Sequence, residues 1–365
     1  MIWLAILVGT AVLLLMAAML YLAWYLRWET EQTRGMAYYG RPLAERRALK
    51  QRIQTYSAPV KPLVHLLASA NRQRATMPFF EYEGVCGPTK VSSPEVFARA
   101  KAYHPQPEDV FVVTQMRCGT TWMQQLVYQI VTHGQATIGD RDQGHLYAIS
   151  PWIDAVNSVS IEQAPVVGRR RTRLIKSHLP TSLCPYSADA RYIYVTRHPV
   201  SCFASIADYN RSLLGPLTPP IQTLADWYCS DRMYWLPWPR HVDGFWKWAS
   251  TRDNVLFIHF EEMKKDFAGV RDRVAQFLDC QLTAGELDVV TTRCSFKYMK
   301  DHEELFEMAP PTMFSAAEGE FLASGKESRG DDVTPAVRAQ IVQYCREALT
   351  ASDYPAKRFY PDLFA

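Results

Sequence analysis

The cysteine and histidine groupings that hold metals are missing from this sequence. None of its eight cysteines lies in a CxxC pair, and no histidines cluster at the spacing of metal ligands. Structural zinc sites and small disulfide scaffolds both need such groupings. We therefore expect a reducing compartment, no structural zinc and no metal in the functional site. The cysteines stand singly at Cys86, Cys118, Cys184, Cys202, Cys229, Cys280, Cys294 and Cys345.

A large excess of charge of either sign is also lacking. The 365 residues include 40 Lys and Arg against 37 Asp and Glu, which gives a formal net charge of +3. Because nucleic-acid binders neutralise phosphates with an excess of basic residues, this balance argues against a nucleic-acid partner. Nearly half of the residues are hydrophobic, at 48%. The length suits one large α/β domain or two smaller ones.

Charged side chains are absent from residues 1–26, which are rich in Leu, Ala, Val, Ile and Met. At 1.5 Å per residue, such a helix spans a hydrocarbon core of about 30 Å. A cleaved signal peptide is the alternative. The stretch lacks a basic start, exceeds the ~7–15 apolar residues of a signal peptide, and is followed by no A-x-A-like site. We predict a transmembrane helix over residues 1–28.

The flanks of this segment predict its orientation. Basic residues follow it and none precedes it, so the positive-inside rule places the rest of the chain in the cytoplasm. The expected protein is a single-pass membrane protein with a cytoplasmic globular domain. Aromatic residues that suit a membrane interface lie at Trp24, Tyr25 and Trp28. The basic residues are Arg27, Arg34, Arg41, Arg46, Arg47, Lys50 and Arg52.

Residues 29–76 are basic and helix-forming, and we predict a juxtamembrane linker or helix there, followed by a globular domain over residues 77–365. Leu43, Leu49 and Ile53 alternate with basic residues as in a surface helix. A second group, Val64, Leu66 and Leu67, would lie on the membrane or on the domain. An ordinary solvated linker helix fits the same pattern.

Strand-like runs alternate with helical patterns along the rest of the chain, which predicts an α/β domain with a parallel sheet covered on both faces. Ligands of such sheets bind beyond the carboxyl ends of the strands. The expected strands are 110–114, 172–176, 192–196 and 255–260. The expected helices include 200–213, 266–278, 284–292 and 335–349.

The first junction, from Val110 to Ile130, combines a strand, a tight turn and a helix N-terminus. Unpaired backbone N–H groups, the positive end of the helix dipole and Arg117 together favour an anion such as phosphate. Turn geometry alone also explains Gly119 and Thr120. The P-loop consensus GxxxxGK[ST] is absent, because the second Gly and the Lys are missing.

Two further junctions carry reactive or cationic residues. The second strand ends on Lys176 and His178, and a histidine there suits a general base, although a surface or capping role is the simpler alternative. The third strand is followed by Arg197 and then by Ser201 and Ser205 in the first turns of a helix, which would make a second anion site. A ligand with two separated phosphates fits both junctions.

The region 209–248 is dense in aromatic residues and prolines. Aromatic residues are common in cores, but the prolines favour a pocket that is built from loops and accepts an apolar molecule. The aromatic residues are Tyr209, Trp227, Tyr228, Tyr234, Trp235, Trp238, Phe245, Trp246 and Trp248.

In these motifs the chain resembles the sulfotransferase family that uses 3′-phosphoadenosine 5′-phosphosulfate (PAPS), over roughly residues 107–278 with weaker traces to 331. PEDVFVVTQMRCGTTW is similar to the strand and 5′-phosphosulfate loop of the family, YPKSGTTW, and KSHLP is similar to its KTHLP. RYIYVTRHPVSCFASIADY resembles the 3′-phosphate motif, with Ser205 eight residues after Arg197. PWPRHVDGFWKW, NVLFIHFEEMKKD and CSFKYMK follow in the family's order.

This resemblance implies a three-layer sulfotransferase fold with a central parallel sheet and a P-loop-like phosphate-binding loop. It implies that His178 takes a proton from an acceptor hydroxyl while Lys176 and Arg117 stabilise the transferring group. Loop amides with Thr120 and Thr121 would hold the 5′-phosphate, Arg197 and Ser205 the 3′-phosphate, and Trp122 and Phe296 the adenine. The candidate nucleotide-binding residues are Arg117, Cys118, Gly119, Thr120, Thr121, Trp122, Arg197, Ser205, Phe260, Phe296, Lys326 and Arg329.

The sequence departs from the family pattern in two places. Arg117 and Cys118 replace the usual Lys and Ser of the loop, so a fixed cation remains to stabilise the anion, but it is a poor proton donor to the leaving group. The C-terminal RKGxxGDW element is reduced to GKESRGD, in which Lys326 or Arg329 would supply the charge.

The expected function is sulfuryl transfer from PAPS to a hydroxyl or amine of a small or lipid-like acceptor at the membrane. Two alternatives remain from the residues. A P-loop phosphotransferase would need the loop Lys and an acidic Mg²⁺ ligand, neither of which is evident. A membrane-tethered protein that binds the nucleotide without turnover would not need His178.

Overall fold

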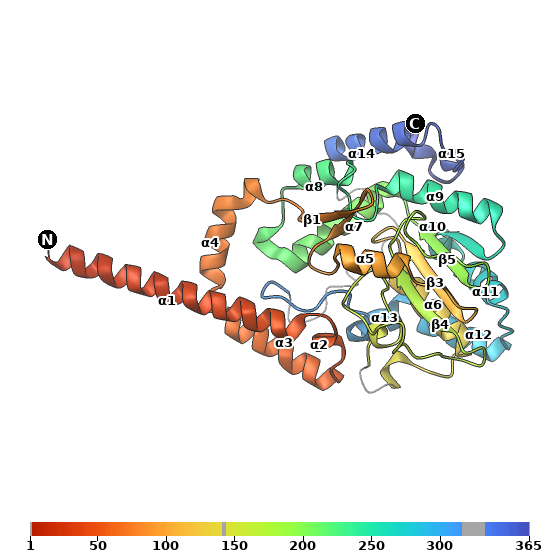
Figure 1. Ribbon diagram of the computed structural model, residues 1–365, viewed down its shortest axis with the longest axis horizontal. Coiled ribbons are helices and arrows are strands. Elements are labelled where there is room, and N and C mark those ends of the chain that lie inside the picture. The colour runs from red at the N-terminus through yellow and green to blue at the C-terminus, as the bar shows by residue number, and fades with distance from the viewer. Residues whose placement is uncertain (1, 141–143, 316–332, 365) are drawn as a thin grey trace.

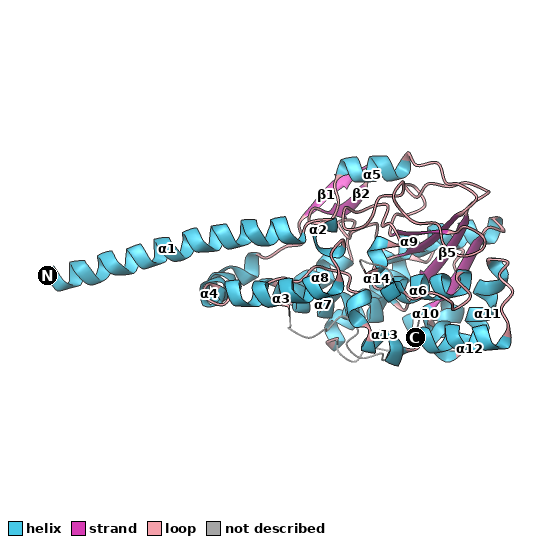
Figure 2. Cartoon of the chain, turned by 90° about the horizontal axis from the view of Figure 1, so that it is seen from below, coloured by secondary structure: helices cyan, strands magenta, loops and turns pink. Residues whose placement is uncertain are grey.

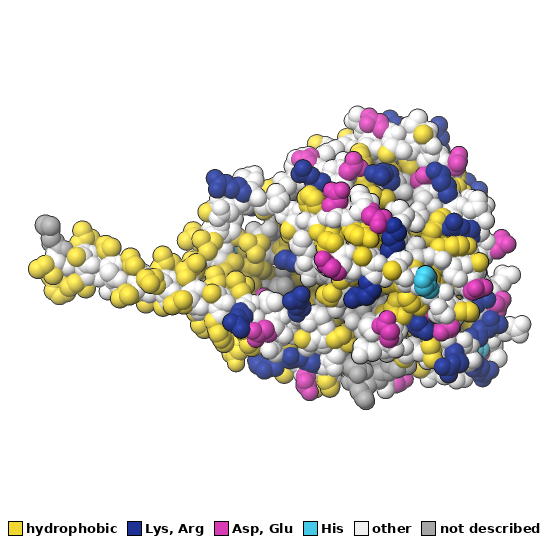
Figure 3. Space-filling model, viewed as in Figure 1, with side chains coloured by type: hydrophobic (Ala, Val, Ile, Leu, Met, Phe, Trp, Pro, Cys, Tyr) yellow, Lys and Arg dark blue, Asp and Glu magenta, His cyan; other side chains and the backbone are white. Residues whose placement is uncertain are grey.

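A computed structural model describes residues 2–140, 144–315 and 333–364 of the chain. Helix α1 (Ile2–Thr33) projects from a body that holds the other elements (Figures 1 and 2). It is long and apolar enough to cross a membrane, and its most apolar part is fully exposed. Hydrophobic side chains cover this projecting part on the face seen in Figure 3. The predicted apolar helix therefore exists and extends five residues beyond residue 28.

A four-stranded parallel sheet forms the centre of the body, with the strand order β4-β3-β5-β6. Its strands are β3 (Asp109–Thr114), β4 (Arg173–Ser177), β5 (Arg191–Thr196) and β6 (Val255–His259). All six residues of β3 are buried, because both faces of the sheet are covered. The four strands that the apolar runs predict are confirmed to within one residue at either end.

Two hydrophobic cores, one on each face of the sheet, give the predicted three layers. Alternate side chains of β3 divide between them, with Phe111 and Val113 in one core and Val110 and Val112 in the other. The first core is closed by α5 (Pro94–Lys101), α7 (Pro199–Leu214), α8 (Ile221–Tyr228), α9 (Trp238–Thr251) and α14 (Pro335–Ala348). The second is closed by α6 (Thr120–Val131), α10 (Phe260–Lys265), α11 (Phe267–Phe277), α12 (Ala284–Arg293) and α13 (Phe296–Asp301).

Smaller elements complete the body. A hairpin of β1 (Phe79–Tyr82) and β2 (Val85–Pro88), which no clear pattern in the sequence predicts, precedes α5. The short helix α15 (Ala356–Phe359) follows α14.

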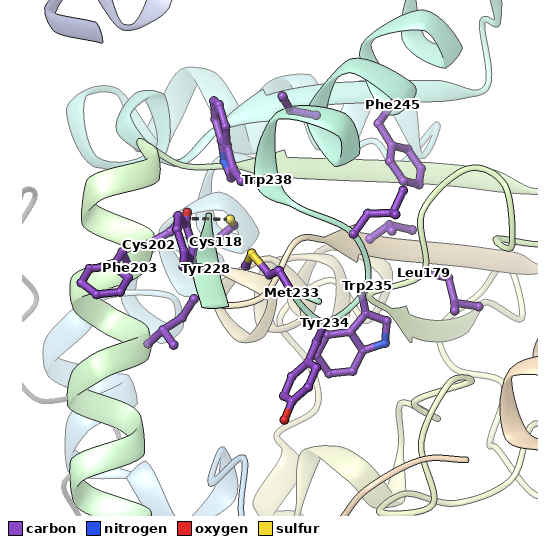
Figure 4. Close-up of a cluster of buried hydrophobic side chains, with 14 of the residues drawn as sticks. Cys118, Leu179, Cys202, Phe203, Tyr228, Met233, Tyr234, Trp235, Trp238 and Phe245 are labelled. Atoms are coloured by element: carbon purple, nitrogen blue, oxygen red, sulfur yellow. Dashed lines mark hydrogen bonds between the residues drawn. The ribbon is translucent and has the colours of Figure 1, made fainter. Parts of the chain in front are cut away.

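The aromatic region 209–248 is mostly core, which corrects in part the expectation of a loop-built pocket, while Tyr209, Tyr234 and Trp235 do line a cavity. Trp238 and Phe245 belong to α9 and are fully buried (Figure 4). Trp227 and Tyr228 belong to α8 and are buried as well. The many prolines end or begin helices here, as Pro237 does before α9, rather than marking a long loop.

The basic segment after α1 packs onto the body as α2 (Met36–Tyr39), α3 (Leu43–Ser57) and α4 (Lys61–Asn71). Leu49 and Ile53 of α3 are fully buried in the same core as the sheet. Arg46 is 1% exposed, and its two terminal nitrogens donate hydrogen bonds of 2.7 Å to the carbonyls of Glu304 and Gly144. This helix is therefore fixed to the body by a buried cation and an apolar face.

Replacing Arg46 should destabilise the body far more than replacing a neighbouring exposed arginine. Arg46→Met leaves two buried carbonyls without their donors, so we expect a loss of about 3 kcal/mol in the free energy of unfolding. Arg52→Met, on the exposed side of α3, should cost less than about 0.5 kcal/mol. Chemical denaturation in detergent, followed by tryptophan fluorescence, compares the two. Equal effects would contradict the integration of α3 into the body.

Candidate active site

One cavity of about 1110 Å³ lies beyond the carboxyl ends of the four parallel strands. The segments that follow β3, β4, β5 and β6 each contribute to its wall, as expected for an open α/β sheet. Of the residues that the sequence indicated, the wall contains Arg117, Gly119, Thr120, Thr121, Trp122, Lys176, His178, Arg197, Ser205, Phe260 and Phe296.

The loop after β3 is shaped by two left-handed residues. Arg117 has φ 64° and Gly119 has φ 103°, which turns the chain from β3 into the N-terminus of α6. A Cβ on Gly119 would lie 2.8 Å from the ring of Phe260, so only glycine fits at this point. The helix presents free backbone N–H groups and the positive end of its dipole to the cavity, together with Thr120 and Thr121. This geometry suits a phosphate.

Arg117 adds a full positive charge to that loop. Its Nε donates a hydrogen bond of 3.1 Å to Ser205 Oγ of α7, and its guanidinium lies 5.0 Å from the ring centre of Tyr209. These contacts hold the charge between the loop after β3 and the helix after β5. The structure thus brings Arg117 and Ser205 together, although the motifs place them on different predicted anion sites.

Arg197, after β5, is a buried cation on the same wall. It is 6% exposed, its guanidinium lies 4.5 Å from the ring centre of Phe260, and its Nε has no hydrogen-bond partner among the described residues. A buried guanidinium donor without a partner is costly unless an anion binds it. The cavity therefore fits a ligand with anionic groups near both Arg117 and Arg197.

The aromatic end of the cavity is formed by Trp122 and Phe296. Trp122 stacks on Phe267 with an interplanar angle of 4°, and its Nε1 donates a hydrogen bond of 2.8 Å to the carbonyl of Cys294. Phe296 begins α13 and is 43% exposed. Exposed aromatic rings at the rim of a cavity suit the flat face of a base.

His178 is fixed in one orientation by the strand end beside it. Its Nδ1 lies 2.8 Å from the backbone carbonyl of Thr114. Because a carbonyl only accepts, Nδ1 carries the proton and Nε2 keeps its lone pair. Burial and, secondarily, the charge of Lys176 hold the pKa of His178 well below its usual value. The imidazole is therefore neutral and ready to accept a proton at neutral pH.

Lys176 belongs to β4, lies two residues before His178 and is 1% exposed. Its Nζ donates a hydrogen bond of 2.8 Å to Tyr147 Oη and lies 3.5 Å from the ring centre of Trp152. Burial lowers the pKa of Lys176 to about 7, against the opposing charge of Asp154. Its protonation consequently depends on nearby anions.

Asp154 is a residue that the sequence analysis missed. Its carboxylate is fully buried and accepts hydrogen bonds from Ser177 Oγ at 2.9 Å, the backbone N–H of His178 at 3.1 Å and Trp152 Nε1 at 2.9 Å. It thereby fixes the backbone of His178 and faces the charge of Lys176. A lone carboxylate in the apolar stretch PWIDAV was the available signal.

Three of the residues that the sequence indicated are not among the described residues that line the cavity. The side chain of Cys118 is fully buried, and its Sγ lies 3.2 Å from Cys202 Sγ in the core (Figure 4), so only its backbone faces the loop. Lys326 and Arg329 lie outside the described residues. Within the described ranges, no three His, Cys, Asp or Glu residues group as metal ligands, and the expected absence of a metal stays a prediction.

Comparison with known proteins identifies a family. The sulfotransferase domain family matches residues 107–353. Mouse sulfotransferase 2B1 is 28% identical over 255 residues, which cover 68% of this chain and 73% of its own. Mouse sulfotransferase SULT7A1 complexed with PAP aligns with a TM-score of 0.61 and 20% identity, over 79% of this chain and 99% of its own. Retinol dehydratase in complex with retinol and PAP aligns with a TM-score of 0.59 and 20% identity, over 80% and 96%.

The two solved structures confirm the predicted fold. The family match spans more than half of the sequence and includes the loop after β3, the end of β4 and the helix after β5. The chain therefore belongs to the PAPS-dependent sulfotransferase family and is a sulfotransferase.

Proposed function

We propose that the protein transfers the sulfuryl group of PAPS to a hydroxyl, or an amine, of a lipid-like acceptor at the cytoplasmic face of a membrane. The single observation that carries this proposal is the position of His178. His178 lines the same cavity as Arg117 and Arg197, and because its Nδ1 is bound to the Thr114 carbonyl, Nε2 is the nitrogen left to accept a proton. A base and an anion site in one cavity are what sulfuryl transfer needs.

The nucleotide would lie across the carboxyl ends of β3 and β5. The 5′-phosphosulfate suits the loop of Arg117 and Gly119 at the N-terminus of α6, and the 3′-phosphate suits the unpartnered donor of Arg197. The adenine suits the aromatic rim of Trp122 and Phe296. The sulfotransferase and the retinol dehydratase named above were both crystallised with PAP, which supports this assignment.

Transfer then moves one proton and one sulfuryl group. Nε2 of His178 takes the proton of the acceptor hydroxyl as the acceptor oxygen bonds to sulfur. The bond between sulfur and the bridging oxygen breaks, and its electron pair remains on the departing phosphate. Lys176 and Arg117 would stabilise the negative charge that spreads over these oxygens.

The acceptor side of the cavity favours an apolar molecule. Tyr209, Tyr234 and Trp235 line the wall, with Leu213 and Leu217. One fold neighbour was solved with retinol, an apolar alcohol. The apolar α1 and the basic residues after it support attachment to a membrane with the body on the cytoplasmic side.

Binding without turnover is the remaining alternative. Calorimetry with PAP, combined with a screen of acceptors for labelled sulfate transfer, separates binding alone from catalysis. A phosphotransferase is disfavoured by the family match.

Replacing His178 should abolish transfer while nucleotide binding persists. In His178→Asn the amide nitrogen can still donate to the Thr114 carbonyl, but no basic nitrogen remains, and His178→Ala removes both. We expect kcat to fall about 10²–10⁴-fold in each variant, with the Kd for PAP changed less than about threefold. Transfer of labelled sulfate and calorimetry measure the two quantities. Full activity of His178→Asn would remove the base assignment.

Arg117→Lys should reduce turnover more than nucleotide affinity. A lysine lacks the planar guanidinium with which Arg117 binds Ser205 and at the same time faces the cavity. Negative charge on the bridging oxygen develops only as its bond to sulfur breaks, so the loss should affect the transition state more than nucleotide binding. We expect kcat to fall about tenfold or more while the Kd for PAP changes less than about threefold. Arg211→Lys, an exposed position on α7, is the matched control. Equal losses in kcat and affinity would show that Arg117 only binds the nucleotide.

The pH dependence of kcat/KM should follow the protonation of Lys176. Its lowered pKa, about 7, means that Lys176 loses its charge as the pH rises through neutrality. His178 is neutral throughout this range, since its pKa is held well below its usual value. We therefore expect kcat/KM for PAPS to fall, up to tenfold per pH unit, above about pH 7, and this fall to be absent in Lys176→Met. A rising profile between pH 6 and 8 would contradict the assignment.

A further inference from the structure

The membrane-spanning helix also belongs to the wall of the active-site cavity. Three residues of its last turns and the residue directly after it line the same cavity as His178. They are Glu29, Thr30, Thr33 and Arg34. Residues of the segment before β1 and after β2, among them Met77 and Lys90, line the wall as well. A helix that only tethered the enzyme would not need to form part of its site.

The depth of these residues relative to the bilayer follows from the helix geometry if Leu26, the last residue of the uncharged stretch, marks the edge of the hydrocarbon core. The uncharged stretch of α1 ends at Leu26, and Arg27 is the first charged residue. At 1.5 Å per residue, Thr30 lies about 6 Å beyond Leu26. The headgroup layer on each side of the hydrocarbon core is about 5–8 Å thick. This part of the cavity wall therefore lies at the level of the headgroups.

A second apolar surface borders the cavity on the same side of the body. Leu217, in the 3-10 turn Gly215–Leu217, lines the cavity and is 45% exposed. Helix α4 contacts that turn and exposes Leu66 by 68% and Leu67 by 42%. Figures 1 and 2 both show α4 on the side of the body from which α1 projects. Apolar residues exposed next to a transmembrane helix fit a surface that rests on the bilayer.

The end of α1 is hydrogen-bonded to two other segments of the body, one at Met313 and one at Asn157. Glu29 accepts a hydrogen bond of 3.0 Å from the backbone N–H of Met313, and the N–H of Gly35 donates to Asn157 Oδ1 at 3.2 Å. Asn157 lies three residues after Asp154, the carboxylate that fixes His178. The end of α1 is consequently a fixed part of the wall.

We propose that the last turns of α1 form the rim of an opening at the membrane surface, through which the acceptor, a hydroxylated lipid dissolved in the same bilayer, enters the site. The inference rests on the proposed function and specifies its substrate class. The cavity of about 1110 Å³ exceeds the usual ~300–1,000 Å³ of a site for one ligand. It therefore has room for the nucleotide at the loop after β3 and for an apolar body that extends toward α1.

The test uses the full-length chain in phosphatidylcholine and phosphatidylglycerol nanodiscs, with two acceptors. Oleyl alcohol is dissolved in the bilayer, and 4-nitrophenol is supplied in water. Thr30→Trp narrows the proposed opening, and the Thr30 side chain has its hydrogen bond only within α1, to the Leu26 carbonyl. Glu31→Trp places the same bulk on the next residue, whose exposed side chain is outside the cavity wall.

We expect Thr30→Trp to lower kcat/KM for oleyl alcohol at least tenfold, with kcat/KM for 4-nitrophenol and the Kd for PAP changed less than twofold. Glu31→Trp should leave all three within twofold of the unaltered chain. The inference is overturned if Thr30→Trp lowers the use of both acceptors equally, or of neither. Transfer by the unaltered chain to 4-nitrophenol but not to oleyl alcohol overturns the inference alone. Transfer to neither acceptor overturns the proposed function as well.

Discussion

The hydrogen bond from His178 Nδ1 to the carbonyl of Thr114 is the contact on which the active site depends. Thr114 ends β3, and its hydroxyl lies 2.6 Å from Thr120 Oγ1 at the start of α6. One residue therefore connects His178, the proposed base that follows β4, with the proposed phosphate loop after β3. Two parallel strands in register bring both to one edge of the sheet, and burial keeps the imidazole neutral. The proposed proton acceptor and the proposed phosphate loop thus have a fixed relative position.

The sequence predicts those parts of the fold and site that follow from local pattern. The four strands are short buried apolar runs, and the sites of Arg117, His178 and Arg197 follow because parallel strands end at the same edge. Cores and pockets use the same types of aromatic residue, so composition alone does not distinguish the buried Trp238 and Phe245 from residues of a pocket wall. Asp154 and Arg46 act through contacts with residues that are distant in the sequence. The periodicity of the sequence carries no information about such contacts.

The role of α1 depends on such distant contacts in the same way. Composition alone marks residues 1–28 as apolar and charge-free, but the cavity wall begins just after this stretch, at Glu29. A soluble sulfotransferase meets an apolar acceptor from water, where such molecules are scarce. A cavity that opened between headgroups, as proposed here, would instead draw on the high local concentration of the acceptor in the bilayer. The helix that anchors the protein would then also form part of the acceptor-binding site.

The protonation of His178 tests this account most directly. Nitrogen-15 NMR of the histidine-labelled full-length chain, with His178→Asn to assign the signal, distinguishes the two ring nitrogens. The account predicts, between pH 6 and 8, a neutral ring with the proton on Nδ1 and an unprotonated Nε2. A proton on Nε2, or a doubly protonated ring at pH 7, would contradict it, because His178 would then have no lone pair with which to accept the proton of the acceptor.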